Sequence, residues 1–205
     1  MDKKADMYEF GMFSTKEELS YVEKQLKEQL ELALEILNLQ GSLKPIWMIY
    51  GQETTHRLNV GWRNNQDKDL LFEKIIPTIL YRLKAKSFIM CCESWIRMYE
   101  DKAQADKYKR GDLHTDPEAE SIIMGVYASK DKKQGALVKV NSVSLENSTK
   151  FIAEDKIIWI EANNLDGAIT KIIEKMDKIP SEYTSIQIEK IYRLALSNGS
   201  LQQEK

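Results

Sequence analysis

One stretch of the chain, Ser87 to Tyr99, limits the fold more than any other, because it is the longest run with the composition of a β-strand. One face of this strand would carry apolar side chains, broken only by Ser94: Phe88, Met90, Cys92, Ile96 and Met98. The other face begins apolar and then turns polar: Ile89, Cys91, Glu93, Trp95, Arg97 and Tyr99. The pattern predicts a strand whose first half is buried and whose second half is half open to solvent.

The segments before this strand predict a long helix and a hairpin. Apolar residues recur every three or four positions, which indicates an amphipathic helix over 15–39 with Ser14 and Glu17 as its capping box. Alternating residues then predict a β-hairpin over 46–63, with His56 at the surface.

The remaining segments predict helices and short strands. Pro77 is expected to kink or break the helix that precedes the long strand, because proline has no backbone N–H. After the long strand, alternating patterns predict four further strands, at 119–128, 136–143, 145–153 and 156–160. Two helical patterns come last, at 166–176 and 183–196, and a polar tail follows them.

This order of elements predicts an α+β fold. Consecutive strands joined by short turns favour an antiparallel sheet of about five to seven strands, with the long N-terminal helix and further helices packed on one side. The 205 residues suffice for one sizeable core. We expect an N-terminal arm over 1–13, an α+β domain over 14–176, and a C-terminal helix with a polar tail over 177–205.

Charge and hydropathy argue against several classes of function. The net charge is −2, so no overall field attracts nucleic acid or an anionic membrane. The N-terminus has no apolar core typical of a secretory signal, and no apolar run is long enough to span a membrane. Cys91 and Cys92 are adjacent and would point to opposite faces of a strand, so we expect both to stay reduced. The expected location is the cytoplasm, or the host cytosol if the protein is viral.

The densest group of polar residues lies on and after the long strand, and it provides the candidate catalytic residues: Glu93, His114, Asp116, Glu118 and Glu120. They would converge if the long strand and strand 119–128 formed a hairpin. A histidine with several carboxylates suits a divalent ion such as Zn, Mn or Mg, which can activate water. Asp116, Pro117 and Glu118 are also typical of a structural turn. We favour the turn, since the spacing matches no specific metal motif, and we assign no cofactor.

The polar half of the long strand also provides the candidate ligand-binding residues, Trp95, Arg97 and Tyr99. Basic residues of the following loop alternate with tyrosines, a pattern that can track phosphates and stack bases. Acidic residues in the same loop cancel most of that charge, which favours a solvated loop. We expect loop 100–118 to fold back over Trp95, with Arg97 meeting Asp116 or Glu118, and Gly125 to leave room beside the indole.

Residues 85–140 resemble a loose group of small uncharacterised phage and prokaryotic proteins. The resemblance is carried by Glu93-Ser94-Trp95 in a central strand and by Asp116-Pro117-Glu118-Ala119-Glu120 at the start of the next. Members of that group pair an S-E-x-W-like strand with D-P-x-x-E at a strand start, whereas here the acid precedes the serine. The resemblance implies linked roles for Glu93, Trp95, Asp116 and Glu120 and names no reaction.

Two functions are therefore expected as alternatives. The first is a non-catalytic binding or interaction protein of unknown ligand, with a phage or mobile element as its expected source and a protein partner or a homodimer through the long N-terminal helix. The second is a metal-assisted hydrolase or nuclease that uses the acidic cluster. A catalytic site needs those carboxylates within a few ångströms of one another in a concave pocket, which separates the two alternatives.

Overall fold

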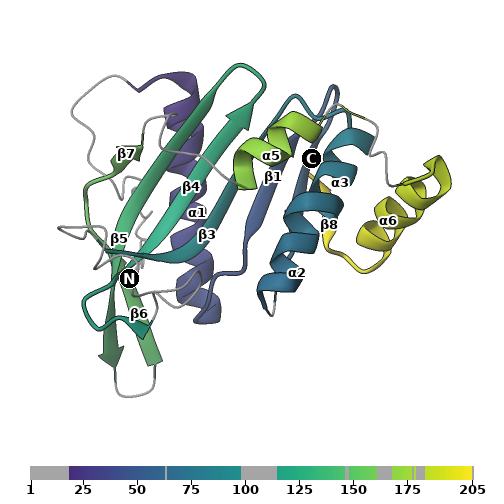
Figure 1. Cartoon of the computed structure of the whole chain (residues 1–205). Coiled ribbons are helices and arrows are strands. Elements are labelled where there is room, and N and C mark those ends of the chain that lie inside the picture. The colour runs from purple at the N-terminus through teal and green to yellow at the C-terminus, as the bar shows by residue number, and fades with distance from the viewer. Residues whose placement is uncertain are drawn as a thin grey trace, which may run out of the picture.

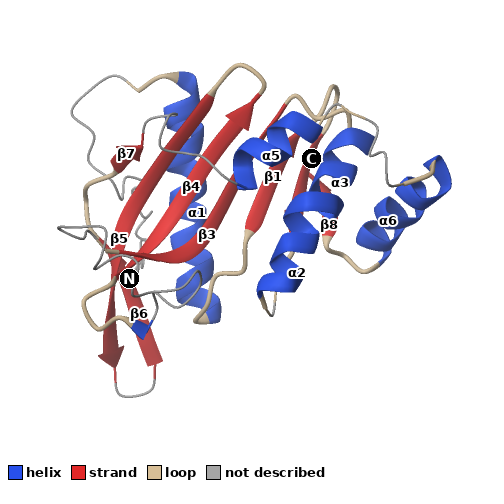
Figure 2. Ribbon diagram, in the orientation of Figure 1, coloured by secondary structure: helices blue, strands red, loops and turns tan. Residues whose placement is uncertain are grey.

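The computed structural model describes residues 19–62, 64–97, 115–145, 148–160, 168–176, 178 and 183–204. Within this part the chain has the predicted α+β fold, built on one antiparallel sheet of eight strands (Figures 1 and 2). The strand order is β6-β5-β4-β3-β1-β2-β8, and β7 pairs with β5.

The strands are β1 (Ile46–Tyr50), β2 (Thr55–Asn59), β3 (Ser87–Ile96), β4 (Glu120–Ser129), β5 (Lys133–Leu145), β6 (Ser148–Ala153), β7 (Ile158–Ile160) and β8 (Leu201–Glu204). The helices are α1 (Tyr21–Gln40), α2 (Asn65–Leu70), a π-helical turn η1 (Leu71–Ile75), α3 (Ile76–Arg82), α5 (Ala168–Lys175) and α6 (Ser185–Ser197).

Strand β3 occupies the centre of the sheet. It pairs with β1 on one side, from Ser87 to Cys91, and with β4 along its whole length on the other. Side chains from Phe88 to Cys92 are buried on both faces, whereas Trp95 keeps 40% of its surface exposed. The predicted change from a buried half to a half-open half is therefore confirmed.

Helices cover both faces of the sheet, so the prediction of helices on one side was wrong. Helix α1 packs on one face, where its leucines contact Ile89, Cys91 and Ile123. The helical run from α2 to α3 and helix α5 pack on the other face, over Phe88 and Met90, while α6 lies against α3 and the β8 edge (Figure 1). Because β3 is apolar on both faces in its first half, it fits a sheet covered from both sides.

Helix α1 begins later than predicted. Ser20 is its N-cap and Glu23 completes a capping box, because the Ser20 hydroxyl accepts from the Glu23 N–H and the Glu23 carboxylate accepts from the Ser20 N–H. The predicted cap at Ser14 lies outside the described residues. Gly41, with φ of 72°, ends the helix.

The apolar stripe of α1 is covered by the chain's own sheet. Leu26, Leu30 and Ala33 have no exposed surface, and Leu34 and Leu37 have almost none. The homodimer was inferred from this stripe, and since Leu26 to Leu37 pack on the chain's own sheet, the stripe gives no argument for a second copy; the homodimer stays a prediction.

Pro77 does not break the helix that contains it. The helical run passes from Asn65 to Arg82 and changes to π-helical hydrogen bonding over Leu71–Ile75, just before the proline. A π-helical turn shifts the backbone hydrogen-bonding pattern, so the chain stays helical through a residue that lacks an N–H.

The end of the chain differs from the predicted polar tail. Leu201–Glu204 forms β8, which pairs with β2 and extends the sheet at that edge. Leu201 is buried, while Gln202 and Gln203 are exposed. The paired residue His56 is buried, so the prediction that it lies at the surface was wrong.

No helix in the described ranges is both long and apolar enough to cross a membrane.

Candidate functional site

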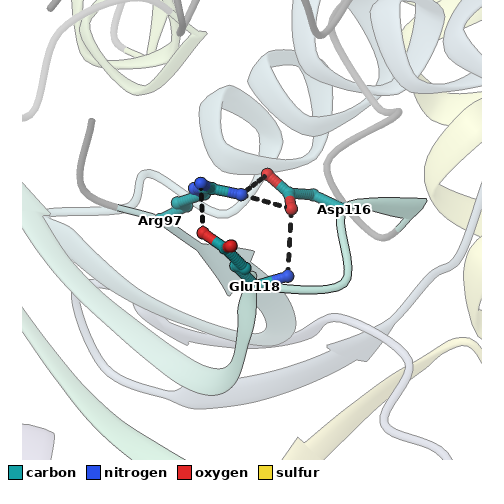
Figure 3. Close-up of polar contacts among 3 residues, drawn as sticks. All are labelled: Arg97, Asp116 and Glu118. Carbon is teal, nitrogen blue, oxygen red and sulfur yellow. Dashed lines mark hydrogen bonds and ion pairs between the residues drawn. The ribbon is translucent and has the colours of Figure 1, made fainter. Parts of the chain in front are cut away.

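Arg97, directly after β3, holds the turn that leads into β4 (Figure 3). Its guanidinium donates to both carboxylate oxygens of Asp116, at 2.5 and 2.6 Å, and also pairs with the Glu118 carboxylate. The Asp116 side chain is fully buried, and that of Glu118 is 72% exposed. The predicted meeting of Arg97 with these acids is confirmed.

Asp116 also organises its own turn. Its Oδ1 accepts a hydrogen bond from the Glu118 N–H at 3.0 Å, and its carbonyl accepts one from the Ala119 N–H at 3.0 Å. Pro117 stands at the second position of this turn, where its fixed φ is favourable. Since Arg97 and the Glu118 amide occupy its oxygens, Asp116 has the contacts of a structural residue.

Glu93 and Glu120 do not converge. In the β3–β4 ladder Glu93 pairs with Ile123 and Ile96 pairs with Glu120, so the two carboxylates lie on opposite faces of the sheet. Glu120 forms an ion pair with Lys139 of β5 at 2.7 Å. The predicted joint cluster of acidic residues is wrong in this respect, because the pairing register separates its members.

Two other candidates, His114 and Tyr99, lie outside the described residues, so their roles stay predictions. Within the part of the chain that the structure describes, no group of three or more histidine, cysteine, aspartate or glutamate side chains is placed to hold a metal ion.

The structure does form a cleft at the half-open end of β3. Its volume is about 460 Å³, and its walls come from residues 43–45 before β1, from Gly61 and Trp62 after β2, and from Glu93 and Trp95 on β3. This cleft exists because β1 pairs with β3 only as far as Cys91, and the chain before β1 then leaves the strand. A volume of this size is typical of a small-ligand site.

Two tryptophans and one carboxylate give this indole cleft its chemistry. The Glu93 side chain is half-buried and accepts a hydrogen bond from the Leu43 N–H at 3.4 Å. Trp62 is half-buried and meets the Phe72 ring edge-on, with 5.6 Å between the ring centroids. Trp47 meets the same Phe72 ring edge-on at 5.5 Å. Lys44 lies at the exposed rim.

Trp62 already binds a cation of the chain itself. The Lys68 ammonium lies 5.0 Å from the centre of its ring, within the range of a cation–π interaction. The ring of Trp62 therefore already contacts one positive charge of the chain, and it borders a cleft that contains the Glu93 carboxylate.

The adjacent cysteines are both buried, as predicted, and they are not joined to each other. Burial raises the pKa of both thiols, that of Cys92 to about 11. They pack as small apolar side chains on opposite faces of β3, and neither lines the indole cleft.

Sequence reasoning identified Glu93 and Trp95 and missed their neighbours in the cleft. Lys44 and Trp62 are separated from β3 by more than twenty residues, and no motif connects them. The available signal was Pro45, which keeps the chain before β1 from continuing as a ladder partner of β3, since proline has no N–H to donate.

The fold and the cleft together define an α+β protein with a central antiparallel sheet and a small concave site at one end of its middle strand. No family model matches the chain, and no curated protein and no solved structure matches it.

Proposed function

We propose that the chain is a non-catalytic binding protein whose ligand-binding site is the indole cleft. The observation that supports this most is the meeting of Glu93, Trp62 and Trp95 in one concave space of about 460 Å³. We further propose that the group bound there is a cation, such as a protonated amine, a guanidinium or a quaternary ammonium.

The chemistry of the walls supports a cation. Indole faces attract positive charge, and a carboxylate in a half-buried place strengthens that attraction. Glu93 stands inside the cleft, whereas Lys44 is exposed at the rim and its aliphatic stem runs beside Gly61. Glu93 is therefore better placed than Lys44 to contact a bound group.

The alternative of a metal-assisted hydrolase has less support. Such an enzyme would need several of the acidic residues around one ion, while Asp116 is held by Arg97, Glu120 by Lys139, and Glu93 stands on the other face of the sheet from Glu120. Metal analysis of the purified protein tests this alternative directly: stoichiometric zinc or manganese after dialysis would favour it over the binding function.

Indole N–H signals in a nitrogen–proton NMR spectrum test the binding proposal. The chain has four tryptophans, so choline and arginine methyl ester can be titrated while each indole is followed separately. Signals of Trp62 and Trp95 should move and those of Trp47 and Trp159 should stay. For such small probes we expect dissociation constants of about 1 mM or weaker, since a single cation–π contact supplies only about 1–2 kcal/mol.

Three variants sharpen this experiment. Glu93→Gln should weaken binding of both probes, while Glu53→Gln, in the exposed β1–β2 turn, should leave it unchanged. Lys44→Gln should leave cation binding unchanged or tighter. Binding that weakens in Lys44→Gln, or that moves all four indole signals alike, would contradict a cation site in the cleft.

A further inference from the structure

A second concave site lies at the opposite end of β3. It has a volume of about 460 Å³ and is lined by Tyr81, residues 84–86, the turn residues Lys130 and Asp131, and Met176. In Figure 1 the end of α3, the turn between β4 and β5, and α5 all reach this end of the sheet. Lys86 and Trp95 are nine residues apart on an extended strand, so this site is about 30 Å from the indole cleft.

The lining of this lysine pocket carries a net positive charge. Three lysines and one aspartate line it, in a chain whose total charge is −2. Lys84 and Lys86 have no ion-pair partner within the described part of the chain. Their positive charges are therefore available to an anion that enters the pocket.

The walls between the charges are apolar and aromatic. Met176 is buried and belongs to the apolar core between α5 and the sheet, and Tyr81 is half-buried at the end of α3. A ligand that fills this pocket would therefore need an apolar or aromatic part as well as negative charge. The volume is within the range of small-molecule sites and too small for a folded partner.

Lys84 holds its place at a conformational cost. It has φ of 50°, and no other non-glycine residue in the described ranges has a positive φ. This is the position after a helix where glycine is usual, because a side chain there crowds the backbone. Glycine would suit the backbone better, so the lysine at this position contributes something other than helix termination.

We propose that the lysine pocket binds a mononucleotide, with its phosphates at Lys84, Lys86 and Lys130 and its base against Tyr81 and Met176. Lysine ammonium groups bind phosphate oxygens as point charges, and an aromatic ring offers a base a stacking surface. The Asp131 carboxylate at the tip of the turn repels a phosphate group, so it limits the affinity of the pocket for a nucleotide. The inference does not depend on the function proposed for the indole cleft.

Calorimetric titration of the full chain with ADP, pyrophosphate and adenosine tests the proposal. ADP should bind most tightly, pyrophosphate more weakly, and adenosine most weakly, and the affinity for ADP should fall as salt is raised. Binding of pyrophosphate equal to that of ADP would overturn the base contact and with it the nucleotide. Absence of ADP binding at millimolar concentration would overturn the site.

Two variants connect binding to these residues. Lys84→Gly should weaken ADP binding at least about five-fold without lowering the melting temperature, because it removes the charge and relieves the positive φ. Lys150→Gln, on the exposed face of β6, removes a charge far from the pocket and should bind ADP as the wild type does. Equal loss of affinity in both variants would show a general charge effect and overturn the proposal.

Discussion

The Lys175 ammonium donates a hydrogen bond to the backbone carbonyl of Glu73, with 3.1 Å between nitrogen and oxygen. In a regular α-helix this carbonyl would accept from the residue four positions later, and that residue is Pro77, which has no N–H. A side chain of α5 thus satisfies an acceptor that the proline leaves open. Lys171, one turn earlier, pairs with the Glu73 carboxylate at 3.2 Å, so two lysines join α5 to the helical run.

Lys175→Met should therefore lower the free energy of unfolding by about 1 kcal/mol, the usual contribution of one hydrogen bond. The same change should cost less in a Pro77→Ala background, because alanine restores an N–H that can reach the Glu73 carbonyl. Urea unfolding of the four proteins gives the coupling energy. Lys171→Met is the matched control: it removes an exposed ion pair and should change stability by about 0.5 kcal/mol or less.

Asp116→Asn should destabilise the fold much more than Glu118→Gln, although each removes one negative charge from Arg97. Asp116 is fully buried and bonds both the guanidinium and a backbone amide, whereas Glu118 is mostly exposed. We expect a loss of about 2–3 kcal/mol for Asp116→Asn, somewhat below that of a fully buried pair because Arg97 is partly exposed. For Glu118→Gln we expect less than about 1 kcal/mol. Thermal unfolding measures both variants, and a similar loss of stability in Asp116→Asn and Glu118→Gln would contradict the structural role of Asp116.

Met90→Ala should cost about 2–5 kcal/mol, the usual range for truncating a buried side chain. Met90 is 3% exposed and packs under the helices on one face of β3. Val143→Ala, on an exposed position of β5, should change stability by about 0.5 kcal/mol or less when measured by the same urea unfolding. A loss that small for Met90→Ala would contradict its place in the core.

His56 should make the protein less stable in mild acid. Burial lowers its pKa in the folded state, whereas in the unfolded chain it titrates near about 6.5. Below that pH the unfolded state binds a proton that the folded state does not, so the free energy of unfolding falls as the pH decreases toward the folded pKa. His56→Gln should remove this part of the pH dependence of the free energy of unfolding.

Urea unfolding at about pH 7.5 and about pH 5.5 measures the effect, since the unfolded histidine titrates between these values. Between these two pH values the free energy of unfolding should fall by up to about 1 kcal/mol more in the wild type than in His56→Gln. The chain has one other histidine, His114, so His114→Gln serves as the matched control. If that variant, and not His56→Gln, removes the acid sensitivity, the prediction for His56 is wrong.

The sequence predicted the features that depend on local pattern. The alternation in β3 gave its buried and half-open halves, and Asp116 with Pro117 gave a turn beside Arg97. What it missed depends on pairing between distant segments. Strand β8 has one buried apolar residue, Leu201, and owes its position to pairing with β2, so its own composition resembles a tail.

The candidate site was mispredicted for the same reason, because it depends on the pairing register between β3 and β4. A strand alternates its side chains whatever its partner, but only the match of Ile96 with Glu120 decides which residues share a face. That match put Glu93 and Glu120 apart, and the end of the β1–β3 pairing at Cys91 leaves Glu93 in one cleft with Trp62, to which no spacing along the chain connects it. The indole cleft was therefore outside the reach of sequence patterns.

The position of Gly125 also depends on the pairing register. It was expected beside Trp95, but it pairs with Cys91 and lies under α1. A Cβ atom here would stand 3.2 Å from Leu26 Cδ2 and 3.3 Å from Cys91 Sγ, closer than ordinary packing contacts. The absence of a side chain therefore lets the helix approach the sheet closely.

Gly125→Val should lower the free energy of unfolding by about 1–3 kcal/mol, because overpacking forces α1 or its leucines to move. Leu26→Ala makes room at the same place, so the double variant should be more stable than the sum of the two losses predicts. Gly61→Ala is the control: a Cβ atom there meets only the Lys44 stem, at 3.9 Å, and should be tolerated. Urea unfolding of these variants measures all three effects, and strict additivity of Gly125→Val and Leu26→Ala would contradict the close contact between α1 and β4.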